Sequence, residues 1–250
     1  MKQIIAAVAA LAGVAAVANA AMLYTTDFNA PTYTDGALIG QDGWVLTSST
    51  TNPLAVSNAA TNGTVALTTT GQDVRRAFTA VTPVDGESIF FSATFTITAA
   101  QAAGDYFIHL GNDTTSVFNA RVYAKSSGSG FVMAMGTSAG TATYGTTELP
   151  FNTPITMVAR YDFVDGLAND TGAIFINPSN IYGIGDTEYV AATTVGIDAT
   201  LMSSVSLRQG STSNAPTVVV DALSVYTIPT PGSIALVGLA GLVAGRRRRN

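Results

Sequence analysis

The chain has 250 residues, no cysteine and a formal net charge of −5, with 16 Asp and Glu against 11 Lys and Arg. Five of the basic residues, Lys2 and the run from Arg246 to Arg249, lie at the ends, so residues 21–228 hold six basic against 16 acidic residues, a formal charge of −10. This acidic balance disfavours nucleic acid and anionic lipid as partners and leaves cations or neutral sugars as ligands. A segment of this length can bury a sufficient core without disulfides.

Residues 1–20 have the three parts of a secretory signal peptide. Lys2 is the charged start, an apolar run extends from Ile4 to Val17, and Ala18-Asn19-Ala20 is a small-residue cleavage site. We expect cleavage after Ala20. A buried N-terminal helix is the alternative, which the C-terminal pattern described below disfavours.

Short segments with alternating apolar residues fill the body of the chain, residues 21–228. In the clearest segment, Ser88 to Thr98, every second residue from Ile89 to Ile97 is apolar and the residues between are mainly Ser and Thr. Such a period of two predicts a strand with one face in the core. Similar alternation occurs at Val65/Leu67, Tyr106/Ile108/Leu110, Phe118/Ala120/Val122, Phe131/Met133/Met135, Ile155 to Phe163, Ile174/Ile176, Val205/Leu207 and Val218 to Tyr226.

Turn residues separate these segments, for example at Asp85-Gly86 and Asp165-Gly166. About ten strands at this spacing, with almost no helix, predict an all-β fold, an antiparallel two-sheet sandwich of the jelly-roll type. The body is therefore expected to form one domain over residues 21–228.

Three patterns in the body are candidate catalytic or metal sites. Gly136-Thr137-Ser138-Ala139-Gly140 matches a nucleophile motif, but that motif needs a following helix and a later His, and the only His, His109, comes earlier. His109 lies opposite the apolar Tyr106/Ile108/Leu110 face, so we expect it to project toward solvent or a loop. One His without Cys gives zinc too few ligands. The three Glu, at 87, 148 and 188, are widely spaced and form no Glu-x-Asp-x-x-Glu strand, so a glycosidase pair is not indicated.

Two further clusters have ligand-binding alternatives. Oxygen ligands crowd one hairpin in a manner that suits calcium, although Asp and Asn also simply make turns; these residues are Asp162, Asp165, Asn169 and Asp170. Trp44, with Tyr106, Tyr123 and Tyr144, could offer a stacking surface for sugar. Packing at the first strand explains Trp44 better, so no sugar site is assigned from the sequence.

The last segment, residues 229–250, combines the features of a stop-transfer segment with those of a sorting signal. It contains Pro229-Thr230-Pro231, an 11-residue apolar run from Ile234 to Ala244, and Arg246, Arg247, Arg248 and Arg249. Guanidinium groups stay on the cytoplasmic side, so the segment should halt export with its N-terminal side outside. As a helix the run spans roughly 16 Å, short of a ~30 Å hydrocarbon core, which suits a transient anchor. An ordinary single-pass C-terminal anchor is the alternative.

The proline pair, the short apolar helix and the terminal arginines resemble the PEP-CTERM sorting tail of exported bacterial proteins. That family has Glu between the prolines, where this chain has Thr230. The resemblance implies recognition and cutting by an exosortase-like membrane enzyme. It also implies a transient anchor in the inner membrane before delivery to the cell surface or the extracellular polymer.

The body carries a second resemblance. The motifs are Leu38 to Trp44, Gly104 to Phe107, Tyr161 to Phe163, Asn169 to Thr171, Phe175 to Pro178, Leu207 to Gly210 and Val220 to Val225. They resemble a group of exported PEP-CTERM proteins whose body is similar to the concanavalin A-like, laminin G-like sandwich. Because such a sandwich hosts binders, hydrolases and structural modules, the resemblance implies the fold more than an activity.

Together these features predict an exported protein of the cell surface or extracellular matrix, and not an enzyme. We expect a structural or adhesive role with weak binding of extracellular polysaccharide and no cofactor except the calcium considered above. The alternative is a carbohydrate-binding module, or a glycoside hydrolase or lyase, on the same sandwich.

Overall fold

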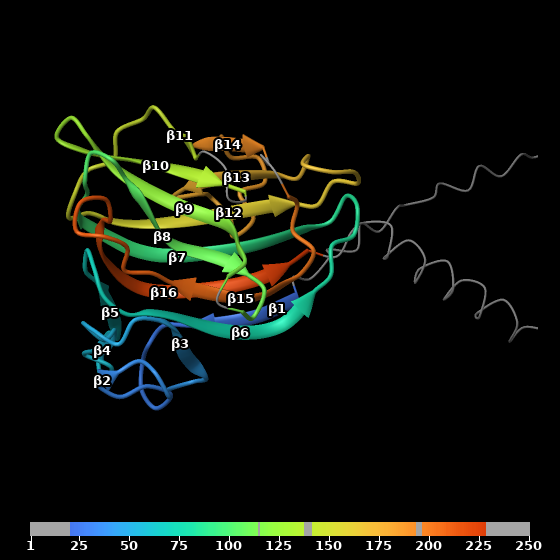
Figure 1. Ribbon diagram of the computed structural model, residues 1–250. Helices are drawn as coiled ribbons and strands as arrows, with labels where there is room; N and C mark the ends of the chain where they lie inside the picture. The colour runs from blue at the N-terminus through green and yellow to red at the C-terminus, as the bar shows by residue number, and fades with distance from the viewer. Residues whose placement is uncertain (1–20, 115, 138–141, 194–196, 229–250) are drawn as a thin grey trace, which may run out of the picture. The chain divides into compact units, whose positions relative to one another are not determined.

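The computed structural model describes residues 21–114, 116–137, 142–193 and 197–228 (Figure 1). Every regular element in these ranges is a β-strand, which confirms the all-β prediction. None of the described segments is a helix with the length and apolar character needed to cross a bilayer. The signal peptide, the C-terminal helix and the sorting motif were predicted on residues 1–20 and 229–250, which lie outside the described residues.

The strands form two sheets. The larger sheet has nine strands, β1 (Ala21–Thr26), β2 (Gly36–Ala37), β4 (Ala55–Ser57), β5 (Thr64–Leu67), β7 (Ser88–Ala99), β12 (Pro154–Asp162), β13 (Thr171–Ile176), β14 (Val190–Thr193) and β16 (Thr217–Thr227). The smaller sheet has seven strands, β3 (Trp44–Ser48), β6 (Asp73–Val81), β8 (Asp105–Gly111), β9 (Phe118–Ser127), β10 (Gly130–Gly136), β11 (Thr143–Tyr144) and β15 (Met202–Leu207).

All strand pairs described are antiparallel, and the order of strands departs from the order of the chain. The larger sheet runs β14-β13-β12-β7-β16-β5-β4-β2, with β1 also paired to β16, and the smaller sheet runs β11-β10-β9-β8-β15-β6-β3. The longest strands, such as β7 and β16, extend across the width of the domain in Figure 1. The predicted antiparallel two-sheet sandwich is therefore confirmed.

In strand β7 the alternating sequence pattern separates a core side from an outer side. Its apolar residues Phe91 and Phe95 are buried in the core, while Thr94 and Thr96 lie on the outer side, where Thr94 Oγ1 is 3.2 Å from Thr156 Oγ1 of β12. The strand pairs with β12 on one side and β16 on the other, so it is central in the larger sheet. Hydroxyl groups keep this outer side polar with few charges.

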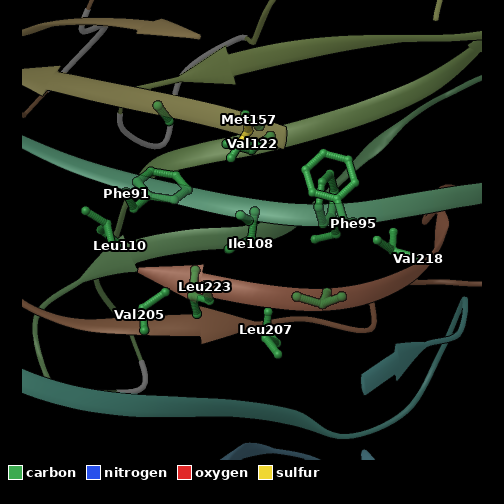
Figure 2. Close-up of a cluster of buried hydrophobic side chains, with 14 of the residues drawn as sticks. Phe91, Phe95, Ile108, Leu110, Val122, Met157, Val205, Leu207, Val218 and Leu223 are labelled. Carbon is green, nitrogen blue, oxygen red and sulfur yellow. The ribbon is translucent and has the colours of Figure 1, made fainter. Parts of the chain in front are cut away.

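The hydrophobic core fills the space between the two sheets (Figure 2). Phe91 and Phe95 of the larger sheet face Ile108 and Leu110 of the smaller sheet, and all four side chains are buried. Trp44 is also buried in this core, as its place in the first strand of the smaller sheet predicts. The core residues in the described ranges all lie within one compact unit, which extends from Ala20 to Ile228.

Strands β8 and β9 depart from strict alternation. The register between them shifts twice, and Ala120 in β9 has a φ of 45°. An extra residue at a bulge turns the following side chains to the opposite face. Phe118 therefore lies with His109 on the outer side, at a ring distance of 4.8 Å, and not with Ala120 in the core as the sequence predicted.

Candidate functional site

The outer side of the smaller sheet carries a cluster of aromatic and basic side chains, which we call the aromatic–basic face. Its members are Tyr106, His109, Phe118, Arg121, Tyr123, Lys125, Tyr144 and Arg208. They come from β8, β9, β11 and the residue after β15. On β9, Arg121, Tyr123 and Lys125 alternate with core residues, because neighbouring side chains of a strand point to opposite sides.

Tyr106 is at the centre of the aromatic–basic face. Its ring centroid lies 5.4 Å from that of Tyr123 and 5.6 Å from that of His109. The guanidinium carbons of Arg208 and Arg121 lie 4.1 Å and 5.1 Å from the same centroid. Cations are attracted to aromatic rings in this arrangement, so the rings and the guanidinium groups fix one another in position.

A cavity of about 260 Å³ opens on this face beside Tyr106. It is lined by Thr47, Ser48, Asp73, Tyr106, His109, Phe118, Ser206 and Arg208. The volume is just below the ~300 Å³ at which small-molecule pockets commonly begin, so the cavity suits a small part of a larger ligand. Aromatic, hydroxyl, carboxylate and guanidinium groups all converge on it, and these are the groups that bind polar ring compounds.

His109 is buried against this cavity, with 3% of its surface exposed. Its Nδ1 lies 3.1 Å from the carbonyl oxygen of Leu110, so we assign the hydrogen to Nδ1, which leaves Nε2 as an acceptor. Burial, with a smaller effect from the positive charges of Arg121 and Arg208, lowers the pKa of His109 to about 3. The imidazole is therefore neutral near pH 7. His109 lies on the outer side, as predicted, but the expectation that it projects toward solvent or a loop is wrong, because the rings of Tyr106 and Phe118 pack against it.

Two carboxylates accompany the basic groups. Asp105 Oδ2 pairs with Arg208 at 2.8 Å. Asp73 lines the cavity, accepts a hydrogen bond of 2.6 Å from the Ser48 hydroxyl, and accepts another of 2.8 Å from the Gln209 backbone N–H. Burial raises the pKa of Asp73, and the nearby charge of Asp105 adds a smaller effect in the same direction.

The outer side of the larger sheet has a different character. Part of it is covered by a second apolar cluster, which contains Phe90, Val158, Ala173, Phe175 and Tyr226. A second cavity of about 260 Å³ lies beside Arg160 and Glu188, whose charges pair with each other at 3.1 Å. No aromatic side chain is among its described lining residues. The aromatic–basic face is therefore the better candidate for ligand binding.

Two of the four calcium candidates, Asp162 and Asp170, use their carboxylate oxygens within the protein. Asp162 pairs with Arg160 at 2.9 Å, and Asp170 accepts a hydrogen bond of 2.7 Å from the Tyr161 hydroxyl. Asn169 donates its amide to the Asp165 carbonyl at 2.6 Å, as in a turn. Within the described ranges no group of three or more His, Cys, Asp and Glu side chains is placed to hold a metal ion. Calcium binding by this hairpin stays a prediction.

The other sequence candidates are dispersed. Ser138 lies outside the described residues, and its motif joins the end of β10 to β11, two strands and not the strand and helix of a nucleophile elbow. Glu148 accepts a hydrogen bond from Ser129, while Glu188 pairs with Arg160.

Three of the four possible stacking residues, Tyr106, Tyr123 and Tyr144, do meet on the aromatic–basic face, whereas the fourth, Trp44, is in the core. Sequence reasoning missed Arg121, Lys125 and Arg208 as members of this face. Arg121 and Lys125 flank Tyr123 at every second position of β9, a pattern that does indicate one shared side. Their partners on β8 and after β15 could not be inferred, because the order of strands in a sandwich cannot be predicted from the sequence of any single strand.

No protein-family model matches the chain, and no curated protein matches it. Among solved structures, an endo-1,3-beta-glucanase from Streptomyces sioyaensis is similar with a TM-score of 0.50 at 13% identity, over 90% of this chain and 100% of that one. A carbohydrate esterase from the Shiga toxin-encoding bacteriophage phi24B is similar with a TM-score of 0.51 at 13% identity, over 84% and 100%. At such identities the likeness shows the fold alone.

These likenesses overturn the expectation that the chain is not an enzyme. That expectation rested on the missing Glu-x-Asp-x-x-Glu strand and the missing serine elbow, yet the same sandwich is the scaffold of a glucanase and an esterase. Catalytic groups on a sandwich can come from strands far apart in sequence, so the lack of one local motif excludes no enzyme. The described domain is a concanavalin-like β-sandwich of the jelly-roll type.

Proposed function

We propose that this protein is exported and binds a glycan on the aromatic–basic face. The observation that carries the proposal is the group of rings around Tyr106, bordered by guanidinium groups and open to a cavity. A sugar presents apolar C–H faces that stack on aromatic rings and hydroxyl groups that hydrogen-bond to charged side chains. The location is part of the proposal: cleavage after Ala20, processing of the tail by an exosortase-like enzyme, and a structural or adhesive role at the cell surface or in extracellular polymer.

The test is binding of the purified chain to a panel of immobilised polysaccharides. We expect Tyr106→Ala to weaken binding about 10-fold, the equivalent of ~1.4 kcal/mol for a lost stacking ring. Tyr182→Ala is the matched control, because Tyr182 packs against Phe90 on the outer side of the larger sheet. Wild-type affinity in a folded Tyr106→Ala protein would contradict the site, and no binding to any glycan would contradict the function.

A second candidate function is cleavage of the bound glycan, and the observation that favours it is Asp73. Burial raises the pKa of this carboxyl in the cavity, as is typical of a general acid, and in its protonated form it can donate a proton to a leaving oxygen. New reducing ends released from a bound polysaccharide would support cleavage, provided that Asp73→Asn abolishes the release and retains binding. Binding without release would leave the protein a binder.

A further inference from the structure

The basic side chains of this acidic domain are concentrated on one side. Residues 21–228 contain six basic residues against 16 acidic residues. Four of the six, Arg75, Arg121, Lys125 and Arg208, belong to the outer side of the smaller sheet. A local excess of one charge on a surface of the opposite overall sign attracts counter-ions to that place.

Among the described residues, two of these four side chains have no acidic partner. Arg75 pairs with Asp113 and Arg208 pairs with Asp105, each at 2.8 Å. Arg121 and Lys125, by contrast, form no ion pair with any carboxylate in the described part of the chain.

Aromatic rings hold these two cations in place. The Arg121 guanidinium lies 5.1 Å from the ring centroid of Tyr106 and 5.8 Å from that of Phe118, and the Lys125 ammonium lies 4.1 Å from that of Tyr144. Arg121 also donates hydrogen bonds to the Phe118 carbonyl at 3.2 Å and the Tyr123 hydroxyl at 3.4 Å. Side chains that are already fixed lose less conformational entropy when a ligand binds, so both are prepared for an anion.

The spacing on β9 defines the kind of anion. Arg121, Tyr123 and Lys125 occupy alternate positions and so share one side of the strand. At ~3.3 Å per residue, the backbone positions of Arg121 and Lys125 are roughly 13 Å apart. One carboxylate or sulfate group is too small to reach both, so the matching ligand carries anionic groups on separate units of a chain, with Tyr123 available to stack on a ring between them.

We propose that the glycan bound by the aromatic–basic face is an acidic polysaccharide, whose carboxylate or sulfate groups are held by Arg121 and Lys125. This inference rests on the proposed function and adds the class of ligand to it. Charge-assisted hydrogen bonds from a guanidinium to a carboxylate or sulfate are stronger than those to a neutral hydroxyl, which gives the preference its physical basis.

The test compares four polymers with the purified full chain: polygalacturonate, the same polymer with its carboxyl groups reduced, dextran sulfate and dextran. We expect at least one acidic polymer to bind at least 10-fold more tightly than its neutral counterpart, with affinity that falls as salt is added. Preference for polygalacturonate or for dextran sulfate identifies the anionic group as carboxylate or sulfate. The double variant R121Q/K125Q should lose the preference, and the charge-conserving variant R121K/K125R should retain much of it.

Arg160→Gln is the charge-matched control for the single variant Arg121→Gln, because each removes one positive charge and Arg160 lies on β12 of the other sheet. A preference for acidic polymers that falls as much in Arg160→Gln as in Arg121→Gln would reflect general charge, and would overturn the inference. Equal binding of acidic and neutral polymers would overturn it too, but would leave the proposed glycan site intact. Binding to none of the four, together with no binding on the wider panel, would overturn both.

Discussion

At the scale of single residues, two buried polar side chains support the aromatic–basic face. His109 is enclosed behind Tyr106 and Phe118 as a neutral imidazole. Gln209, which is 3% exposed, follows directly after Arg208. Both positions can be tested by substitutions that leave the aromatic rings of this face unchanged.

His109 should make the protein sensitive to acid. Its pKa is about 3 in the folded protein, while an unfolded chain has an ordinary histidine pKa of about 6.5. Between these values the unfolded state binds the extra proton, so stability is complete above about pH 6.5 and falls as the pH drops toward 3. At pH 4.5 the loss from this group is about 2–3 kcal/mol.

Urea unfolding of the wild type and His109→Gln at pH 6.5 and pH 4.5 measures this effect. Carboxylates titrate equally in both proteins, so the smaller change expected for His109→Gln isolates the histidine. Equal changes in the two proteins would show that His109 is not held neutral.

Gln209 should be important for stability. Its Oε1 accepts a hydrogen bond of 2.8 Å from the Thr68 backbone N–H, and its Nε2 donates hydrogen bonds to the Asn52 and Gln72 carbonyls at 2.7 Å and 3.1 Å. Gln209→Ala leaves these groups without partners, for an expected loss of about 2–4 kcal/mol in the free energy of unfolding. Gln101→Ala is the control, because no hydrogen bond of its side chain is described. An unchanged denaturation midpoint for Gln209→Ala would refute the role.

At the scale of strands, predictability depended on how much of a strand packs in the core. Strand β7 was predicted with its faces correctly assigned, because a central strand buries one whole side. Strands β2 and β11 have two residues each and were not predicted, because pairing with neighbours defines them and no periodicity can. The bulges of β8 and β9 place Phe118 on the side opposite to the predicted one, where its ring packs against His109. A bulge depends on the partner strand, so it could not be predicted from one segment.

Phe95 should be a major contributor to the core. It is 1% exposed, and its ring centroid lies 5.3 Å from that of Phe107 on the facing sheet. Phe95→Ala should cost about 3–5 kcal/mol in the free energy of unfolding, through lost burial and the cavity that remains. Val45→Ala, at a position 42% exposed in β3, is the control and should change stability by less than about 0.5 kcal/mol. A small effect of Phe95→Ala in chemical denaturation would mean that the two sheets do not pack as described.

At the scale of the whole molecule, the domain combines a hydroxyl-rich sheet, an acidic balance and one basic, aromatic face. Strand β1 pairs with β16 so that Ala21 lies opposite Thr227, which brings the two ends of the described domain side by side. The predicted cleavage site and sorting motif adjoin these ends in the sequence.

The sorting proposal predicts the mass of the mature protein. Protein recovered from cells should begin at Ala21, end near Pro231 and lack the arginines 246–249. Intact mass spectrometry of the secreted and membrane fractions measures both ends. Full arginine tails in the membrane fraction would contradict sorting and favour an ordinary C-terminal anchor.

The central claim is that the aromatic–basic face binds a glycan. Its most direct test is an NMR titration, in which an oligosaccharide ligand is added to the protein and the changes in backbone amide chemical shifts are mapped. The account predicts that the largest changes fall on β8, β9 and the end of β15, around Tyr106, Arg121 and Arg208. Changes centred instead on the outer side of the larger sheet, around Thr94 and Thr156, would contradict it.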